Sequence, residues 1–443
     1  MEIPSPLIID DREHGLFRVR RSAFTSEGIL ALEREKIFGK AWLYVGHGSE
    51  LPKPNDFVTR RVGGRPVIFT RDRAGKIRVL LNTCRHRGAE VCRLPSGNRK
   101  VFTCFYHGWA YDGTGRLVSV PDGDAYSASF DRGQLGLYQP RVESYRDFVF
   151  ATFGDEAPAL VDYLADARYF LDIIADQSTS GMQIVAGTHY YSMQANWKLL
   201  MENSVDGYHA LTVHQTYFEM MMNLGTTPPG VDGNRGIGRG IDLGNGHAVA
   251  MNPELGSPIM SPEILEEKGR WRASLVERFG EEHAFLIANV TRNMDLFPNF
   301  AIVDLGFGIQ VRTMYPTAPG HTEIVGWQLV PGDASEAHKR YRLDNSLTFW
   351  GPAGMATPDD VEGLEQCQRG FAVKEVEWSD ISRGMGRDQP PIVDELQMRV
   401  FWREWNARLT GESYQREGLP HDTSYLRAAS ANAAAAPVSG RAE

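Results

Sequence analysis

The feature that most constrains this chain is a group of two cysteines and two histidines in its first quarter. Cys84 and His86 form one pair, Cys104 and His107 form a second, and 17 residues stand between the pairs. Thiolates and imidazoles bind metals, and a glycine close to each histidine lets the backbone turn near a bound centre. Four ligands on two short loops therefore indicate a metal centre, and the fold must bring the two loops together.

A structural zinc site is the simplest alternative for this group. Zinc-binding pairs usually have two to four residues between cysteines and three to five between histidines. Here each pair combines one cysteine with one histidine, as in a Rieske [2Fe–2S] cluster, where one iron takes both thiolates and the other takes both imidazoles. The spacing favours the Rieske cluster. Cys92, between the pairs, is interpreted as a small buried residue and not as a ligand.

The surrounding sequence predicts two domains in an α+β chain of 443 residues. From Asp56 to about Phe153, short apolar runs alternate with glycine-containing turns, which is typical of a small antiparallel β domain. After about residue 158, helical stretches alternate with strand-like segments such as 321–331, which indicates an antiparallel sheet with surrounding helices. We expect a Rieske domain at 40–157, a larger catalytic domain formed by 1–39 and 158–427, and a disordered tail at 428–443.

Two further segments carry local predictions. Residues 24–40 have apolar side chains at helical spacing, with Thr25 and Ser26 as possible caps and Gly39 as a stop, so we predict a first amphipathic helix there. Residues 223–260 are rich in glycine, proline and asparagine and have weak periodicity, so we predict long loops near the site or a partly mobile cover over it.

Composition excludes several classes of protein. The formal charge of −9 and the isoelectric point near 5.8 provide no broad basic surface, so we expect no nucleic-acid partner. The N-terminus lacks the pattern of a secretory signal, and no apolar run approaches the roughly 20 residues that cross a bilayer. We therefore expect a cytoplasmic protein without a membrane anchor, and the four cysteines are too few for a disulfide scaffold.

A second candidate metal site lies in the segment after residue 195. Asp206, His209 and His214 are spaced as D-x2-H-x4-H. On a regular helix His214 lies about 140° round from His209, because each turn takes 3.6 residues. Both histidines can meet one metal only if the helix loosens or ends between them, and the β-branched Thr212 and Val213 favour such a break. The alternative is an ordinary packed or solvated helix face.

At this point the sequence resembles a known family. The stretch 82–117 resembles the Rieske domain of bacterial aromatic-ring-hydroxylating oxygenases, and the segment 202–214 resembles their iron-binding helix. The resemblance implies a mononuclear Fe(II) held by two histidines and one carboxylate, with open positions for dioxygen. It assigns His209 and His214 as ligands. It assigns Asp206 to a hydrogen-bonded bridge between an iron-site histidine and a cluster histidine of the neighbouring subunit.

The third iron ligand must come from another segment. The sequence GPAG, followed by an acidic pair, resembles the segment of the family that supplies this carboxylate, and it favours Asp360 over Asp359. The same acids also have a purely structural interpretation. Thr357 and Pro358 are typical of a helix start, where carboxylates interact favourably with the helix dipole. The family often has Glu where this chain has Pro358.

The resemblance implies the catalytic large (alpha) subunit of a ring-hydroxylating dioxygenase, which adds dioxygen to an aromatic compound with electrons relayed through the cluster. No nicotinamide or flavin fingerprint is present, so electrons must come from a separate NAD(P)H-dependent reductase, a ferredoxin, or both. The resemblance also implies a homotrimer, often completed by three small β subunits (α3β3). The form ENSVDGYH resembles the branch that acts on aromatic acids such as benzoates, cumate and salicylate.

Three other functions are weighed against this one. A Rieske monooxygenase or O-demethylase would use the same scaffold. A non-catalytic Rieske electron carrier is disfavoured by the long sequence after the β domain, and a zinc-stabilised binding protein is disfavoured by the mixed pairs.

The sequence also suggests side chains that hold an apolar ring near the iron, although core packing explains them equally well. These candidate pocket residues are Met220, Met221, Met222, Phe307, Trp350 and Met355. A carboxylate substrate also requires a local cation, which the sequence does not identify.

Overall fold

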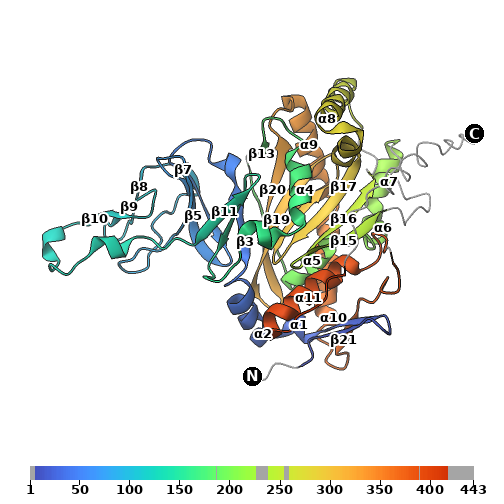
Figure 1. Ribbon diagram of the computed structural model, residues 1–443, viewed down its shortest axis with the longest axis horizontal. Helices are drawn as coiled ribbons and strands as arrows, with labels where there is room; N and C mark the ends of the chain where they lie inside the picture. Colours follow the sequence, from blue (N-terminus) through green and yellow to red (C-terminus); the bar gives the residue numbers. More distant parts are fainter. Residues whose placement is uncertain (1–4, 186, 226–237, 254–258, 389, 418–443) are drawn as a thin grey trace, which may run out of the picture. The chain divides into compact units, whose positions relative to one another are not determined.

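The computed structural model describes residues 5–185, 187–225, 238–253, 259–388 and 390–417 (Figure 1). The chain forms two compact units, one of residues 34–163 and one that combines residues 1–33 with 164–443. The tail predicted to be disordered, 428–443, lies outside the described residues. No helix in the described ranges is long and apolar enough to cross a membrane.

The smaller unit is built from short antiparallel strands, as its turn-rich sequence predicts. Its strands form three sheets, with the orders β11–β12–β3, β6–β5–β4–β7 and β10–β9–β8. The strands are β3 (Trp42–His47), β4 (Asp56–Val62), β5 (Arg65–Arg71), β6 (Ile77–Leu81), β7 (Ser96–Asn98), β8 (Val101–Thr103), β9 (Ala110–Asp112), β10 (Leu117–Ser119), β11 (Arg141–Tyr145) and β12 (Phe148–Thr152). Short helical turns are η2 (Gly48–Glu50), η3 (Gly123–Ala125) and η4 (Arg132–Leu135), and α3 (Leu160–Leu164) closes the unit. Cys92 lies in its buried core, beside both Cys84 and Cys104 in the same cluster of apolar side chains.

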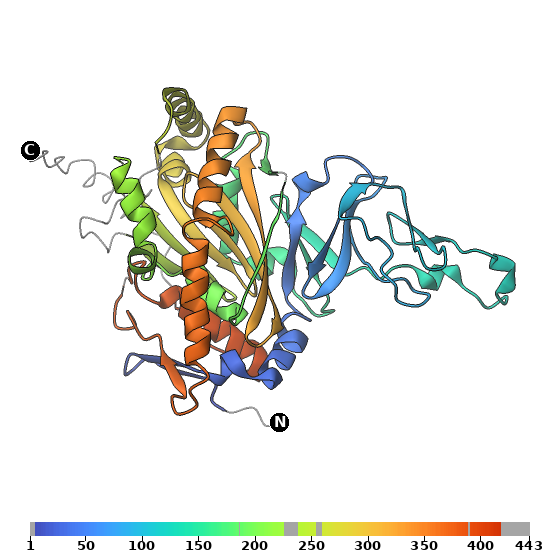
Figure 2. The same cartoon turned by 180° about the vertical axis from the view of Figure 1, so that it is seen from behind.

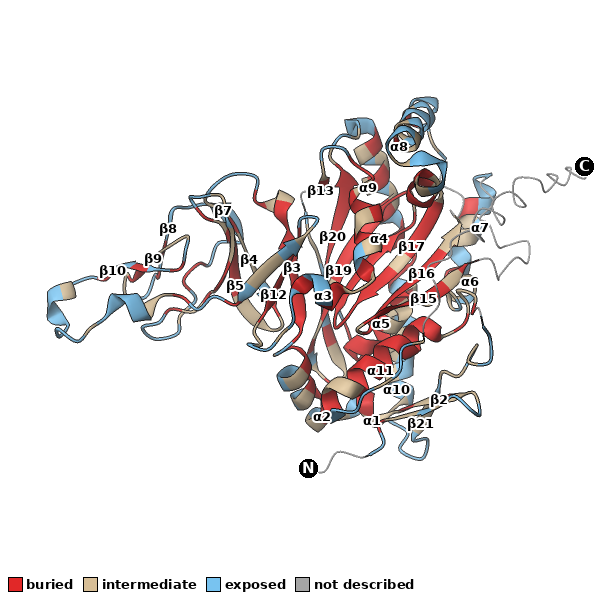
Figure 3. Cartoon of the chain, in the orientation of Figure 1, coloured by how far each residue is buried: buried red, intermediate tan, exposed pale blue. Residues whose placement is uncertain are grey.

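The larger unit is organised around one antiparallel sheet with the strand order β13–β20–β19–β18–β17–β16–β15, and β14 also pairs with β20. Its strands are β13 (Met182–Ile184), β14 (His189–Met193), β15 (Arg239–Gly244), β16 (His247–Pro253), β17 (Val290–Leu296), β18 (Phe300–Asp304), β19 (Ile309–Ala318) and β20 (His321–Pro331). A small sheet of β1 (Ile8–Asp11), β2 (Leu16–Arg20) and β21 (Trp378–Asp380) joins the two ends of the chain. The central strands are buried along most of their length (Figure 3).

Helices pack on this sheet and carry the residues of interest. The helix α5 packs on β17, β18 and β19, α11 packs on β15 and β16, and α9 packs on β19 and β20. Seen from behind, α9 and α10 follow one another end to end (Figure 2). The helices are α4 (Ala167–Ala175), α5 (Trp197–Ser204), α6 (Ala210–Val213), α7 (Gln215–Asn223), α8 (Pro262–Asn289), α9 (Glu336–Trp350), α10 (Thr357–Gly370) and α11 (Leu396–Thr410). The predicted combination of an antiparallel sheet with surrounding helices is confirmed.

The helix predicted at 24–40 is present in a divided form. A short α1 (Ser22–Thr25) ends at Ser26, α2 (Glu27–Leu32) follows, and a π-helical turn η1 (Glu33–Ile37) completes the segment. Ser26 is the cap, because its side chain accepts a hydrogen bond from the backbone N–H of Ile29. Thr25 lies inside α1 and does not cap α2.

The prediction of long loops over 223–260 was wrong for the part that the structure describes. Strands β15 and β16 lie there and pair antiparallel. Arg239 is opposite Met251 at one end of the pair, and Gly244 is opposite His247 at the other. Their connection contains Asn245 and Gly246, both with positive φ, which is the backbone that a tight hairpin turn requires. The strands lacked an alternating pattern because most of their residues are buried, so neither face is polar. Residues 226–237 and 254–258 lie outside the described ranges.

Candidate functional sites

The two Cys/His loops of the smaller unit have the same backbone geometry. In each loop the cysteine N–H donates to the carbonyl of the residue five positions later, at 2.8 Å in both cases. These acceptors are Ala89 and Trp109. Gly88 then donates to the carbonyl of Cys84 at 2.9 Å, and Gly108 donates to that of Cys104 at 3.0 Å. Both glycines have positive φ, +79° and +71°, which other residues rarely adopt. The sequence therefore builds two matching turns, each of which presents one cysteine and one histidine.

The cysteines and histidines of these loops differ in burial. Cys84 and Cys104 are buried in the core of the unit, whereas His86 is exposed and His107 is partly exposed. The two imidazole rings lie 4.5 Å apart between centroids, and His86 stacks on Trp109. Two buried sulfurs and two neighbouring outer imidazoles match the division of ligands in a Rieske cluster, where each iron takes one kind.

Tyr111 is a further residue of this site that the sequence did not indicate. Its hydroxyl oxygen accepts a hydrogen bond from the backbone N–H of Arg85 at 3.1 Å and lies 3.3 Å from Sγ of Cys84. The hydroxyl proton therefore remains free to be donated to the sulfur. Burial and the adjacent Cys84 raise the pKa of Tyr111, so it stays a donor. Hydrogen bonds to cluster sulfurs are a recognised means of adjusting reduction potential.

In the larger unit, a short helix lies between the two histidines and ends at the second one. His209 precedes α6, and His214, with φ −98° and ψ 29°, separates α6 from α7. The two rings face each other with centroids 5.2 Å apart. The predicted loosening or end of the helix between the histidines is not observed, because α6 occupies all four positions between them and the backbone N–H of His214 donates to the carbonyl of Ala210. The helix ends at His214 itself.

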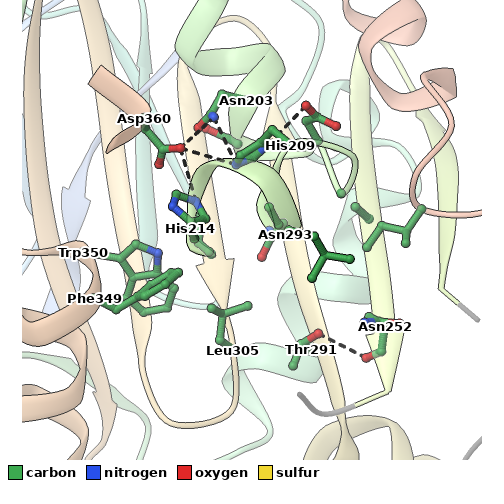
Figure 4. Close-up of a pocket in the computed structure, with 18 of the residues that line it drawn as sticks. Asn203, His209, His214, Asn252, Thr291, Asn293, Leu305, Phe349, Trp350 and Asp360 are labelled. Carbon is green, nitrogen blue, oxygen red and sulfur yellow. Dashed lines mark hydrogen bonds and ion pairs between the residues drawn. The ribbon is translucent and has the colours of Figure 1, made fainter. Parts of the chain in front are cut away.

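Asp360 completes this group from α10. Its Oδ1 lies 3.4 Å from Nε2 of His209 and 3.3 Å from Nε2 of His214 (Figure 4). One atom of each of the three residues lies within 4.8 Å of the others, as a single metal ion requires. Asp359 is more distant, at 3.8 Å from Nδ1 of His214, and its side chain is 39% exposed against 10% for Asp360. The geometry therefore selects Asp360 from the acidic pair.

The electrostatics of the group suit a divalent cation. Burial lowers the pKa of His209, but the carboxylates of Asp206 and Asp360 outweigh this and raise it to about 9. Burial opposes ionisation of Asp360, yet the two histidines lower its pKa. Asn203 donates from Nδ2 to Oδ1 of Asp360 at 3.1 Å and fixes the carboxylate. Two imidazoles and one carboxylate on one face of a metal ion form the donor set of non-haem Fe(II) sites.

Asp206 contacts the opposite edge of the His209 ring. Its Oδ2 lies 3.1 Å from Nδ1 of His209, whereas Nε2 faces Asp360. The other oxygen of Asp206 accepts the backbone N–H of Tyr208 at 2.6 Å. Asp206 is therefore placed to orient the imidazole from behind, and it lies apart from the three converging ligand atoms.

A cavity of about 170 Å³ adjoins this group. The predicted pocket residues Met221, Phe307 and Trp350 line it. Met220 and Met355 do not line the cavity but pack against the apolar side chains that do, and Met222 is 43% exposed. Consecutive residues of α7 project about 100° apart, so three adjacent methionines cannot all face one cavity.

The sequence missed much of the cavity lining. Its aromatic and aliphatic part includes Tyr217, Phe218, Val303, Leu305 and Phe349, and its polar part includes Asn203, Asn252, Thr291, Asn293 and Arg312. Thr291 and Asn293 alternate along β17, a signal that single-sequence reasoning can detect only after the strand is placed. Asn252 lies in β16, in the segment predicted as loop.

Comparisons with known proteins agree with both sites. Residues 41–145 match the Rieske [2Fe-2S] domain, and residues 184–411 match the ring hydroxylating alpha subunit (catalytic domain). The chain is 36% identical to the anthranilate 1,2-dioxygenase large subunit of Acinetobacter baylyi, over 91% of this chain and 87% of that protein. It is 33% identical to the 2-halobenzoate 1,2-dioxygenase large subunit of Burkholderia cepacia, over 86% and 83%.

A solved structure gives the same result for the fold. Naphthalene 1,2-dioxygenase with indole bound in the active site superposes with a TM-score of 0.82 at 27% identity, over 97% of this chain and 98% of that one. The chain belongs to the family of ring-hydroxylating dioxygenase alpha subunits, Rieske-type non-haem iron enzymes. Its cofactors are a Rieske [2Fe–2S] cluster and a mononuclear iron, and the predicted resemblance is confirmed.

Proposed function

We propose that this chain is the subunit that hydroxylates an aromatic acid, with His209, His214 and Asp360 as the ligands of Fe(II). The convergence of these three side chains beside the cavity carries the proposal. When bound, the iron supplies open positions at which dioxygen is activated. Asn203 holds Asp360 in place by its N–H donor, and the apolar lining keeps water from the ring of the substrate.

The electron supply rests on the second group of residues. We assign Cys84 and Cys104 to one iron of the cluster and His86 and His107 to the other, and the bound cluster accepts and passes single electrons. Asp206 then acts as a positioning residue. It holds the His209 ring and, in the assembled enzyme, bridges to a cluster histidine of a neighbouring subunit.

An aromatic acid is the favoured substrate class for two reasons. The anthranilate and 2-halobenzoate enzymes, which are 36% and 33% identical, carry aromatic acids in their names. Arg312, the cation among the described residues that line the cavity, is buried, and its Nη2 donates to Oγ of Ser204 at 2.8 Å. A buried cation favours an anionic group nearby, because the charge interaction is strong away from water.

The partners follow from the class of protein. The relatives are named as large or alpha subunits, which supports a homotrimer completed by a small subunit as α3β3. A ferredoxin, a reductase, or both, would deliver electrons from NAD(P)H. We propose that the enzyme works in the cytoplasm together with these partners.

The test is product analysis with labelled dioxygen. The reconstituted enzyme, with an electron donor and a panel of aromatic acids, is expected to place both atoms of one ¹⁸O₂ molecule into a cis-dihydrodiol acid. Incorporation of a single labelled atom would instead establish the monooxygenase or O-demethylase alternative. Turnover of neutral hydrocarbons with no turnover of acids would contradict the substrate class.

A further inference from the structure

The cavity has two chemically different walls. Phe349 and Trp350 lie on one side, and Asn293, Thr291 and Asn252 lie on the other, with the iron-binding group at one end (Figure 4). Asn252 and Thr291 are paired neighbours on β16 and β17, and Asn293 follows Thr291 by two positions on β17. Residues with this relation share a sheet face. The three side chains therefore form one polar strip, opposite the aromatic side chains.

Asn293 brings a buried and unpaired acceptor to this strip. Its Oδ1 is buried and has no hydrogen-bond partner among the described residues. Thr291, by contrast, donates its hydroxyl to the backbone carbonyl of Asn252 at 3.2 Å. Removing a carbonyl acceptor from water without a donor is unfavourable, so a ligand that brings a donor to this point gains affinity.

A carboxamide offers more than an acceptor. Its Nδ2 supplies two N–H donors beside the carbonyl oxygen, in one plane. A hydrocarbon ring matches neither group, and a plain benzoate offers acceptors alone. A benzoate with an amino or hydroxyl group next to its carboxylate offers an acceptor and a donor side by side, and it matches both ends of Asn293.

We propose that Asn293 is a specificity-determining residue that selects ring acids with a donor group next to the carboxylate, such as 2-aminobenzoate. This inference rests on the proposed function, since it concerns the same cavity and substrate class. The ring lies along Phe349 and Trp350, and its two polar substituents face the strip. Asn293 thereby fixes which edge of the ring is turned toward His209, His214 and Asp360.

The sheet offers a matched control for this residue. Asn293, Val303, Gln310 and Gln328 are paired in sequence across β17, β18, β19 and β20, so they point to the same face. The carboxamide of Gln328 is also buried and without a partner among the described residues. Gln328 does not line the cavity. The change Gln328→Leu therefore removes a buried amide from the same row without touching the substrate.

The experiment compares wild type, Asn293→Leu, Asn293→Asp and Gln328→Leu, each loaded with iron and cluster. Dissociation constants for 2-aminobenzoate and benzoate are measured by anaerobic calorimetry, and kcat/KM is measured for both acids and for toluene. Wild type is expected to prefer 2-aminobenzoate by about tenfold, the value of one or two hydrogen bonds. Asn293→Leu should remove this preference, and Gln328→Leu should keep it.

Asn293→Asp separates the donor from the acceptor. The aspartate still accepts from the amino group but repels the carboxylate, so it should weaken the binding of both acids and lower their kcat/KM relative to that for toluene. An unchanged preference in Asn293→Leu, or no preference in wild type, would overturn the assignment of Asn293. If wild type oxidises neither acid, the proposed function fails, and this outcome is distinct from the failure of Asn293.

Discussion

Replacement of Asp206 by asparagine separates a metal ligand from a residue that transmits electrons. The carboxylate of Asp206 accepts a hydrogen bond from the backbone N–H of Tyr208 at 2.6 Å and makes an ion-pair contact with Nδ1 of His209 at 3.1 Å. Asparagine has one acceptor oxygen, so one of these donors loses its partner. An unsatisfied donor costs about 1–3 kcal/mol, which corresponds to roughly 5- to 150-fold in an equilibrium or rate constant.

We expect this cost to appear in electron passage and not in iron binding. The three converging ligands are unchanged in Asp206→Asn, so iron content and chemical reduction of the cluster should be close to wild type. Reoxidation of the reduced cluster by dioxygen, followed by stopped-flow absorbance with an aromatic acid present, should slow by about 100-fold, the upper range for residues that support a metal ligand.

Asp359→Asn is the matched control. Asp359 also lies near a ligand histidine, but at 3.8 Å from His214 and 39% exposed, so its charge is screened by water. Its reoxidation rate should remain within about twofold of wild type. Loss of iron from Asp206→Asn would make Asp206 a ligand, and a wild-type rate in that variant would refute the bridging role.

The remaining predictions concern the two metal sites and the stability of the larger unit. Cys84→Ala should abolish the visible absorption and the reduced-state EPR signal of the Rieske cluster while iron at the second site remains; an intact cluster would exclude Cys84 as a ligand. Asp360→Ala should lose the mononuclear iron, measured by metal analysis, and keep the cluster. The reverse result, with iron lost in Asp359→Ala alone, would shift the ligand by one residue. Tyr111→Phe removes a donor to Sγ of Cys84. If that hydrogen bond contributes about 1.4 kcal/mol, the midpoint potential of the cluster should fall by roughly 60 mV. Voltammetry measures this potential, and an unchanged value would contradict the prediction. Burial raises the pKa of Glu202 from 4.5 to about 8, so on raising the pH this group ionises first in the unfolded chain, and stability falls between these two values. Glu202→Gln should therefore show a smaller decrease in Tm over this pH range than wild type. The same decrease in both proteins would contradict the raised pKa.

The metal-binding groups are the part of the site that the sequence predicts best. Their ligands come in short, fixed spacings, because each group must turn two side chains toward one point. The end of the helix at His214 was likewise predictable, because the β-branched Thr212 and Val213 just before it are weak helix formers. Asp360 could be favoured from its local sequence, but only its distances to both histidines distinguish it from Asp359.

The cavity and the strands beneath it were much less predictable. Asn293 and Arg312 lie on different strands, and no local pattern marks them as neighbours of the iron-binding group. Strands β15 and β16 are buried on both faces, so they lack the alternation that identifies a strand. Tyr111 is recognised only through its contact with Cys84, because a tyrosine in a β domain is otherwise an ordinary core residue.

The way the chain divides between its two units has a consequence for the order in which the protein folds during synthesis. Residues 34–163 make all their sheet pairings among themselves, so this unit can fold as soon as it leaves the ribosome. The first 33 residues cannot complete their contacts so early. Strand β2 pairs with β21, where Arg18 is opposite Asp380. The buried carboxylate of Glu33 forms an ion pair with Lys198 at 2.6 Å. Contacts so distant in sequence form late. The N-terminal segment, made first, can pair β1 with β2 but must wait for its distant partners until nearly the whole chain has emerged. The smaller unit is therefore expected to be folded before the iron-binding one begins to close.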